Sequence, residues 1–152
     1  MKCAVIYYSK SGTTKALAEK IADRFDADIF PIEPKKAYGS YASAVVRVGA
    51  ERLTRTVPET KTEPLSFDEY DVVFIGFPVW YSAMPQFMQS YLRQCQLHGK
   101  RIIPFATAGS GGQEYALKIV EDIFPDCSVT DHFYTSLRKK ADVSLWLDGI
   151  AL

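Results

Sequence analysis

Four hydroxyl side chains and a glycine stand close together near the start of the chain, in the run Ser9-Lys10-Ser11-Gly12-Thr13-Thr14. The run precedes a helical pattern, so its amides are expected at the positive end of a helix dipole, which favours a phosphate. Gly12 lets an anion approach the backbone closely, and the run holds no carboxylate that would repel one. An ordinary helix cap needs only one hydroxyl, so the four together favour phosphate binding.

The same run departs from the two commonest phosphate motifs. It lacks the GxxxxGK[ST] pattern of P-loop proteins, and the chain has no GxGxxG dinucleotide fingerprint. A monophosphate therefore suits the run better than a pyrophosphate.

Two further runs could enclose the rest of a ligand. Two adjacent aromatic residues in Pro78-Val79-Trp80-Tyr81-Ser82-Ala83-Met84-Pro85 are suited to flank a flat, conjugated ring. Three glycines in Thr107-Ala108-Gly109-Ser110-Gly111-Gly112 allow the backbone to direct amides at a ligand edge. Taken singly, the aromatic pair could cap the core and the glycines could form a flexible turn. Their combination with the hydroxyl run favours a ligand site.

Each of the three runs follows a segment with the pattern of a buried strand. Apolar runs predict five strands, at residues 3–8, 28–32, 71–77, 101–106 and 128–135. Apolar residues at helical spacing predict five helices, which begin near Thr13, Tyr41, Pro85, Tyr115 and Val143. The alternation predicts an α/β fold of three layers, a doubly wound parallel sheet with helices on both faces. Ligands bind such sheets at the carboxyl ends of strands, where the three runs fall.

The composition indicates one soluble domain over residues 1–152. Its 47% hydrophobic residues can form a core, and its 18 basic and 18 acidic residues balance. This balance gives no reason to expect nucleic acid or an anionic membrane as a partner. The three cysteines, Cys3, Cys95 and Cys127, are widely spaced and indicate free thiols in a reducing compartment rather than a metal site. No apolar stretch is long enough to span a bilayer, so we expect a cytoplasmic protein.

The three runs together resemble those of the flavodoxin family. Ser9 to Thr14 fits the family's phosphate loop, (S/T)-x-(S/T)-G-x-T. The stretches Asp71–Pro85 and Gly99–Gly112 are similar to the second and third flavin loops of short, single-domain flavodoxins. The similarity extends from Lys2 to about Trp146. It implies FMN as the cofactor and the strand order 2-1-3-4-5 that flavodoxins have.

The resemblance also implies roles for individual residues. Ser9, Ser11, Gly12, Thr13 and Thr14, with the amide of Lys10, would hold the phosphate. Pro78, Val79, Trp80 and Tyr81 would line the isoalloxazine ring, with Trp80 stacked on it. Thr107, Ala108, Gly109, Gly111 and Gly112 would approach the polar edge of the ring. Ser82 stands where relatives commonly carry glycine. No residue is predicted to act as a general acid or base or to bind a metal.

Two functions are compatible with such a site. The first is electron transfer to or from a redox partner protein. The second is NAD(P)H-dependent reduction of quinones or other small electron acceptors by the same flavin. Flavodoxins that serve only as shuttles are typically strongly acidic, so the neutral charge counts toward the second, but electron transfer remains the main prediction. A phosphoacceptor receiver module needs a carboxylate after the third strand, and Gly76-Phe77-Pro78 has none.

Overall fold

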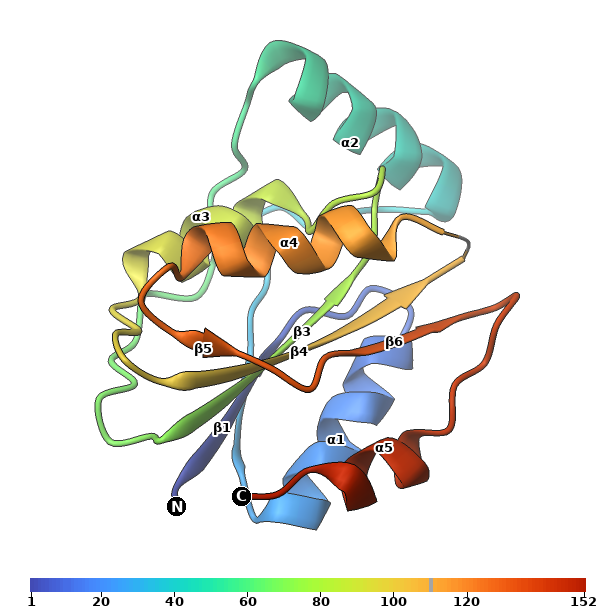
Figure 1. Ribbon diagram of the computed structural model, residues 1–152. Helices are drawn as coiled ribbons and strands as arrows, with labels where there is room; N and C mark the ends of the chain where they lie inside the picture. Colours follow the sequence, from blue (N-terminus) through green and yellow to red (C-terminus); the bar gives the residue numbers. More distant parts are fainter. Residues whose placement is uncertain (110) are drawn as a thin grey trace.

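A parallel sheet crosses the centre of the protein, and helices cover both of its faces (Figure 1). The computed structural model describes residues 1–109 and 111–152. The strands are β1 (Cys3–Tyr7), β2 (Asp28–Pro31), β3 (Val72–Pro78), β4 (Arg101–Ala108), β5 (Ser128–Val129) and β6 (Phe133–Ser136). The helices are α1 (Thr13–Phe25), α2 (Tyr41–Thr54), α3 (Gln86–Gln94), α4 (Gln113–Ile123) and α5 (Val143–Gly149). None of them, within these residues, is both long enough and apolar enough to cross a membrane.

The predicted fold class and strand order are confirmed. The sheet runs β2-β1-β3-β4-β5, with β6 also paired to β4, and every pairing is parallel. The first four predicted strands match β1 to β4 to within two residues at either end. The five helices begin within two residues of their predicted starts.

The fifth predicted strand, 128–135, is divided into β5 and β6. Ile102 of β4 pairs with Val129, whereas Phe105 pairs with Phe133, so this edge of the sheet contains one extra residue. Pro104 lies at the break and has no N–H to donate to the neighbouring strand. The extra residue is accommodated between β5 and β6, where Asp131 has a φ of 51°. The prediction of one continuous strand was wrong because the missing donor acts on a neighbour that is distant in sequence.

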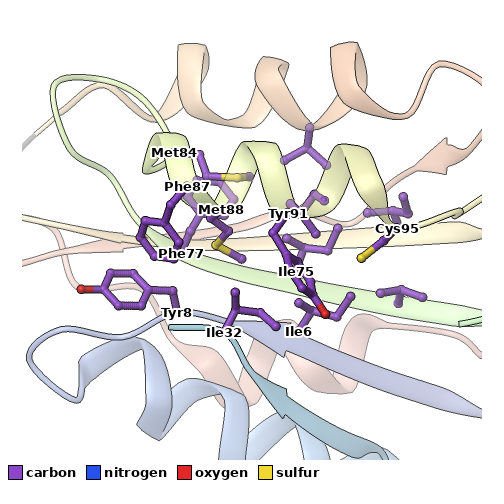
Figure 2. Close-up of a cluster of buried hydrophobic side chains, with 14 of the residues drawn as sticks. Ile6, Tyr8, Ile32, Ile75, Phe77, Met84, Phe87, Met88, Tyr91 and Cys95 are labelled. Atoms are coloured by element: carbon purple, nitrogen blue, oxygen red, sulfur yellow. The ribbon is translucent and has the colours of Figure 1, made fainter. Parts of the chain in front are cut away.

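Apolar side chains fill the space between the sheet and each helical layer. On one face, α3 and α4 pack with part of α2; on the other, α1 and α5 pack together. Figure 2 shows the first of these clusters, in which Ile75 and Phe77 of β3 lie against Phe87, Met88 and Tyr91 of α3. These side chains are fully buried, which holds β3 and the loop after it firmly in place.

Because the strands are parallel, their carboxyl ends share one edge of the sheet. Five connections leave from this edge, which we call the carboxyl-end loops: residues 8–12, 32–40, 79–85, 109–112 and 137–142. The three runs predicted to bind a ligand all belong to this set. Figure 1 shows the loops that precede α1, α4 and α5 at the same end of the sheet.

Candidate functional site

The N-terminus of α1 lacks a side-chain cap. Its N-cap is Gly12, with a φ of 93°, and no side chain accepts a hydrogen bond there. The first helical bond runs from the Ala16 amide to the Gly12 carbonyl oxygen, 2.9 Å away. The preceding amides of Thr13, Thr14 and Lys15 therefore have no carbonyl partner within the helix. The interpretation of this run as an ordinary Ser/Thr cap is wrong.

The hydroxyl groups of the run arrange the loop instead. Ser9 Oγ accepts a hydrogen bond from the Gly12 amide at 3.0 Å, and the hydroxyls of Ser11 and Thr13 lie 3.3 Å apart at the surface. The first turn of α1 contains no acidic residue. By contrast, α4 also begins after an uncapped glycine but carries Glu114 in its first turn. Of these two helix termini, α1 is the better suited to an anion.

Thr14 and Thr107 have a different position from the other hydroxyl residues. Both are buried, and their hydroxyl oxygens form a hydrogen bond of 2.9 Å. The carbonyl oxygen of Thr107 accepts from the Val79 amide at 2.8 Å. These contacts join the ends of the first, second and third loops, so the two threonines position the loops relative to one another.

The second loop contains a strained two-residue turn. Trp80 and Ala83 exchange backbone hydrogen bonds of 2.8 and 3.0 Å, and Tyr81 and Ser82 between them have φ values of 51° and 60°. Two consecutive positive φ values define a type I′ turn, in which Asn-Gly is the favoured pair. An L-residue in the left-handed region costs roughly 1–2 kcal/mol. Other contacts must therefore hold Tyr81 and Ser82 in place.

Helix α2 provides those contacts. The Tyr81 hydroxyl donates to the Val45 carbonyl oxygen at 2.9 Å, and Arg52 Nη1 donates to the Tyr81 carbonyl oxygen at 2.5 Å. The Arg52 guanidinium also lies 5.7 Å from the centre of the Tyr81 ring. Gly49 allows the close approach, since a Cβ there would lie 3.1 Å from the Tyr81 hydroxyl. Three successive turns of α2 thus fix one residue of the second loop.

Trp80 packs edge-on against two tyrosines of the core. The ring centres are 5.6 Å from Tyr8 and 4.9 Å from Tyr38. Burial raises the pKa of Tyr8 to about 12. Burial and a 2.9 Å hydrogen bond to Glu51 also raise the pKa of Tyr38. Both phenols therefore stay neutral well above pH 7, and half-buried Trp80 packs over them at the edge of the core.

Arg47 holds Tyr38, one of the two tyrosines that contact Trp80. Its guanidinium pairs with Glu51 at 2.7 Å and lies 4.0 Å from the centre of the Tyr38 ring. It also donates hydrogen bonds to two carbonyl oxygens of the 32–40 loop, those of Lys36 and Ala37. This network attaches α2 to the loop before it, which fixes the helix that in turn fixes Tyr81.

The third loop touches the second through a glycine. Gly112 has a φ of 90°, and a Cβ at this position would lie 2.9 Å from both Cα and Oγ of Ser82. Gly109 and Gly111 have nothing within 4 Å of the corresponding position. Ser110 lies outside the described residues. Glycine at position 112 is thus required both by its backbone conformation and by the contact with the turn.

A cavity of about 550 Å³ lies between these loops and α2. Seven of the predicted site residues line it, namely Lys10, Val79, Trp80, Tyr81, Gly109, Gly111 and Gly112. Ser9, Ser11, Gly12 and Thr13 lie at the α1 terminus, in the same loop as Lys10 or directly after it. Pro78 and Ala108 are the last residues of β3 and β4. The volume is within the range of small-molecule and cofactor sites.

Sequence reasoning missed the contribution of α2 to this cavity. Tyr41, Ala44, Val45 and Val48 line it, as does Ser82. Ala44 and Val48 are also buried in the core, whereas Tyr41 is 81% exposed. The four residues form one apolar stripe at helical spacing, and such a stripe indicates packing without saying what it packs against. The spacing alone could not separate core from cavity.

The fold and the site together define an α/β protein with an uncapped helix terminus beside an aromatic pocket. Residues 2–150 match the family model described as flavodoxin, so the chain belongs to the flavodoxin family.

Relatives with other names match part of the chain. An NAD(P)H dehydrogenase (quinone) from Nitrobacter winogradskyi is 28% identical over 125 residues, which is 76% of this chain and 62% of the relative. The chain thus spans less than two thirds of the length of this curated relative.

Solved structures match over nearly the whole chain. A candidate flavoprotein from Bacteroides uniformis is 26% identical with a TM-score of 0.82, covering 97% of this chain and 96% of the other. A flavoprotein from Lactobacillus acidophilus, solved in complex with FMN, is 19% identical with a TM-score of 0.76, covering 95% and 97%. The latter similarity establishes the shared fold.

Proposed function

We propose that this protein binds FMN noncovalently and uses it to transfer electrons. The observation that carries the proposal is the uncapped N-terminus of α1. The loop that leads into this terminus contains Lys10, which lines the aromatic cavity. A phosphate needs donors without partners, and a flat ring needs an apolar slot with polar groups at its edge. Both features occur here side by side, and membership of the flavodoxin family supports the assignment.

Each of the three loops would bind a different part of the cofactor. The amides of Thr13, Thr14 and Lys15, with the hydroxyls of Ser9 and Ser11, would hold the phosphate. Trp80 and Tyr81 would flank the ring, and the amides of the third loop would meet its polar edge. When bound, FMN supplies the redox chemistry, and the protein supplies orientation and exclusion of water. Thr14 and Thr107 would act by fixing the spacing of these parts.

A protein redox partner is the first choice for the other side of the reaction. The second candidate is direct NAD(P)H-dependent reduction of a quinone or another small acceptor. It is supported by the name of the Nitrobacter relative and by the largely apolar α2 side of the cavity, which Tyr41, Ala44, Val45 and Val48 line. We also propose a cytoplasmic location, which the three free cysteines support.

The test of the cofactor is the visible spectrum of the purified protein. We expect bands near ~370 and ~450 nm, with FMN released on denaturation. A colourless protein that also fails to quench the fluorescence of added FMN would overturn the proposal.

Anaerobic mixing with NADPH then separates the two functions. Rapid bleaching by NADPH alone selects the reductase, and bleaching only after a reductase is added selects the electron carrier.

A further inference from the structure

The net charge of zero conceals an uneven distribution of charge. Of the 18 basic and 18 acidic residues, the carboxyl-end loops contain six and two, which leaves 12 and 16 for the remainder of the chain. The basic residues in these loops are Lys10, Lys35, Lys36, Arg138, Lys139 and Lys140. The five loops therefore carry a net charge of +4, and the rest of the chain carries a net charge of −4.

Most of these basic side chains are not neutralised by neighbours. Lys35 pairs with Glu59 at 2.7 Å. The other five form no ion pair with any residue in 1–109 or 111–152, and we call these five the basic rim: Lys10, Lys36, Arg138, Lys139 and Lys140. One of the two acidic side chains, Asp142, is engaged as the cap of α5, where it accepts a hydrogen bond from the Leu145 amide at 3.1 Å. Glu33 is exposed.

Three members of the basic rim are fixed beside the third loop. The Leu137 amide donates to the carbonyl oxygen of Ala108, the last residue of β4, at 3.1 Å. Ser136 Oγ accepts from the Lys139 amide at 3.0 Å, and Thr135 Oγ1 accepts from the Ala141 amide at 3.2 Å. Figure 1 shows this loop next to the one that precedes α4. The charges at 138–140 thus stand at the same edge of the sheet as the third loop, although none of the three residues lines the cavity.

Large apolar side chains are exposed among these charges. Leu137 is 81% exposed, Tyr115 at the start of α4 is 71% exposed and Tyr41 at the start of α2 is 81% exposed. Tyr41 and Tyr115 lie in the first turns of α2 and α4, and Leu137 directly follows β6, so all three lie at the carboxyl-end edge of the sheet. Glu114 stands directly before Tyr115, but basic residues still outnumber acidic ones in the loops of this face. Exposed aromatic and apolar residues bordered by polar and charged ones are typical of a surface that binds another protein.

We propose that the carboxyl-end face is the docking surface for a redox protein whose own surface is acidic. The proposal rests on the proposed function, since it places the partner over the loops that would hold FMN. Positive potential on this face would steer an acidic partner toward it and would repel a basic one. The expected partner thus has the opposite charge to the basic partners of strongly acidic shuttle flavodoxins. The two Tyr side chains and Leu137 would contact it once it has docked.

The first test uses one haem protein in two charge forms. Native cytochrome c is basic, and succinylation of its lysines makes it acidic without changing the haem. The FMN-loaded protein, reduced in advance, should reduce the succinylated form faster, and this rate should fall as salt is added. Faster reduction of the native form at low salt would overturn the proposal.

The second test reverses charges on the protein. The variant Lys139→Glu with Lys140→Glu should slow reduction of the succinylated form on the order of ~10-fold at low salt. The matched control, Lys20→Glu with Lys118→Glu, makes the same change in net charge at exposed positions in the middle of α1 and α4. It should change the rate much less. Equal effects of the two pairs would overturn the proposal, because net charge alone would then explain them.

A third measurement does not depend on the flavin. Titration of ¹⁵N-labelled protein with oxidised succinylated cytochrome c should shift amide resonances in residues 8–12 and 137–142, with or without FMN. Shifts spread over the surface, or none at all, would overturn the docking proposal even if FMN binds. If the rim variants instead raise the KM for NADPH and leave both cytochromes unaffected, the rim binds a nucleotide, and the protein-docking proposal is wrong.

Discussion

The loop before α1 and the turn after β3 are held in their conformations by different kinds of contact. The first is self-contained, since Ser9 accepts from Gly12 within the loop and Gly12 itself supplies the unusual φ. The turn at Tyr81 and Ser82 has no glycine and depends on Val45, Gly49 and Arg52 of a distant helix. One half of the site is thus encoded by neighbouring residues, and the other half by contacts across the fold.

The largest effect is expected at the self-contained loop. Gly12→Glu should weaken FMN binding by about 100-fold or more, or roughly 3 kcal/mol, because it sets a negative charge against the phosphate. Nothing lies within 4 Å of the new Cβ, so the cost to folding is the strain of a left-handed L-residue, roughly 1–2 kcal/mol, and the domain should remain folded. Fluorescence titration of the apoprotein with FMN measures the change. Gly99→Glu is the matched control, since Gly99 also has a positive φ and open space around it.

Unchanged FMN affinity in Gly12→Glu would remove the α1 terminus from the site. An equal loss in Gly99→Glu would attribute the effect to the fold rather than to the phosphate.

A smaller effect is expected where the second and third loops meet. Gly112→Ala should push the turn away, because its Cβ would lie 2.9 Å from Ser82 Cα. We expect FMN affinity to fall about 10-fold, a change of ~1.4 kcal/mol. Gly109→Ala, which meets nothing within 4 Å, serves as the control in the same titration. Equal affinities for both variants would show that the loops bind independently.

The next variant releases the turn from α2. Arg52→Ala removes the hydrogen bond to the Tyr81 carbonyl oxygen and should lower FMN affinity about 5-fold, or ~1 kcal/mol. Arg93→Ala, at an exposed position in α3, is the control for loss of a positive charge. If both variants bind FMN alike, Arg52 does not position the turn. The amide resonances of Tyr81 and Ser82 should shift in Arg52→Ala and should stay unchanged in Arg93→Ala.

The smallest effect is expected from relieving the strain itself. Ser82→Gly removes the cost of a φ of 60° and should stabilise the apoprotein by about 1 kcal/mol. FMN affinity should change by less than about 3-fold, since α2 still holds Tyr81. Urea denaturation measures the free energy of unfolding. A loss of stability would mean that the Ser82 side chain contributes more at Gly112 than its backbone costs.

Much of the fold could be predicted because its signals are local. The runs at β1 and β3 have no polar interruption, the centre of β4 is apolar between Arg101 and Thr107, and each strand leads into a helix with a clear apolar stripe. The division of the last strand could not be predicted, because the missing donor of Pro104 acts on residues more than 20 positions away. The α2 wall of the cavity could not be predicted from the sequence for a related reason. A stripe such as Tyr41 to Val48 shows which residues share a face and not what covers it.

The chemistry of single segments can be read from the order of residues alone. Hydroxyls and Gly12 before a helix, aromatics after β3 and glycines after β4 follow from residue type and order, since backbone conformation and helix dipoles act over a few residues. The arrangement in space places α2 along the cavity, holds Tyr81 in a strained turn and brings five basic residues from three loops to one edge of the sheet. Packing and electrostatic potential depend on distances in space, and composition alone contains no such distances.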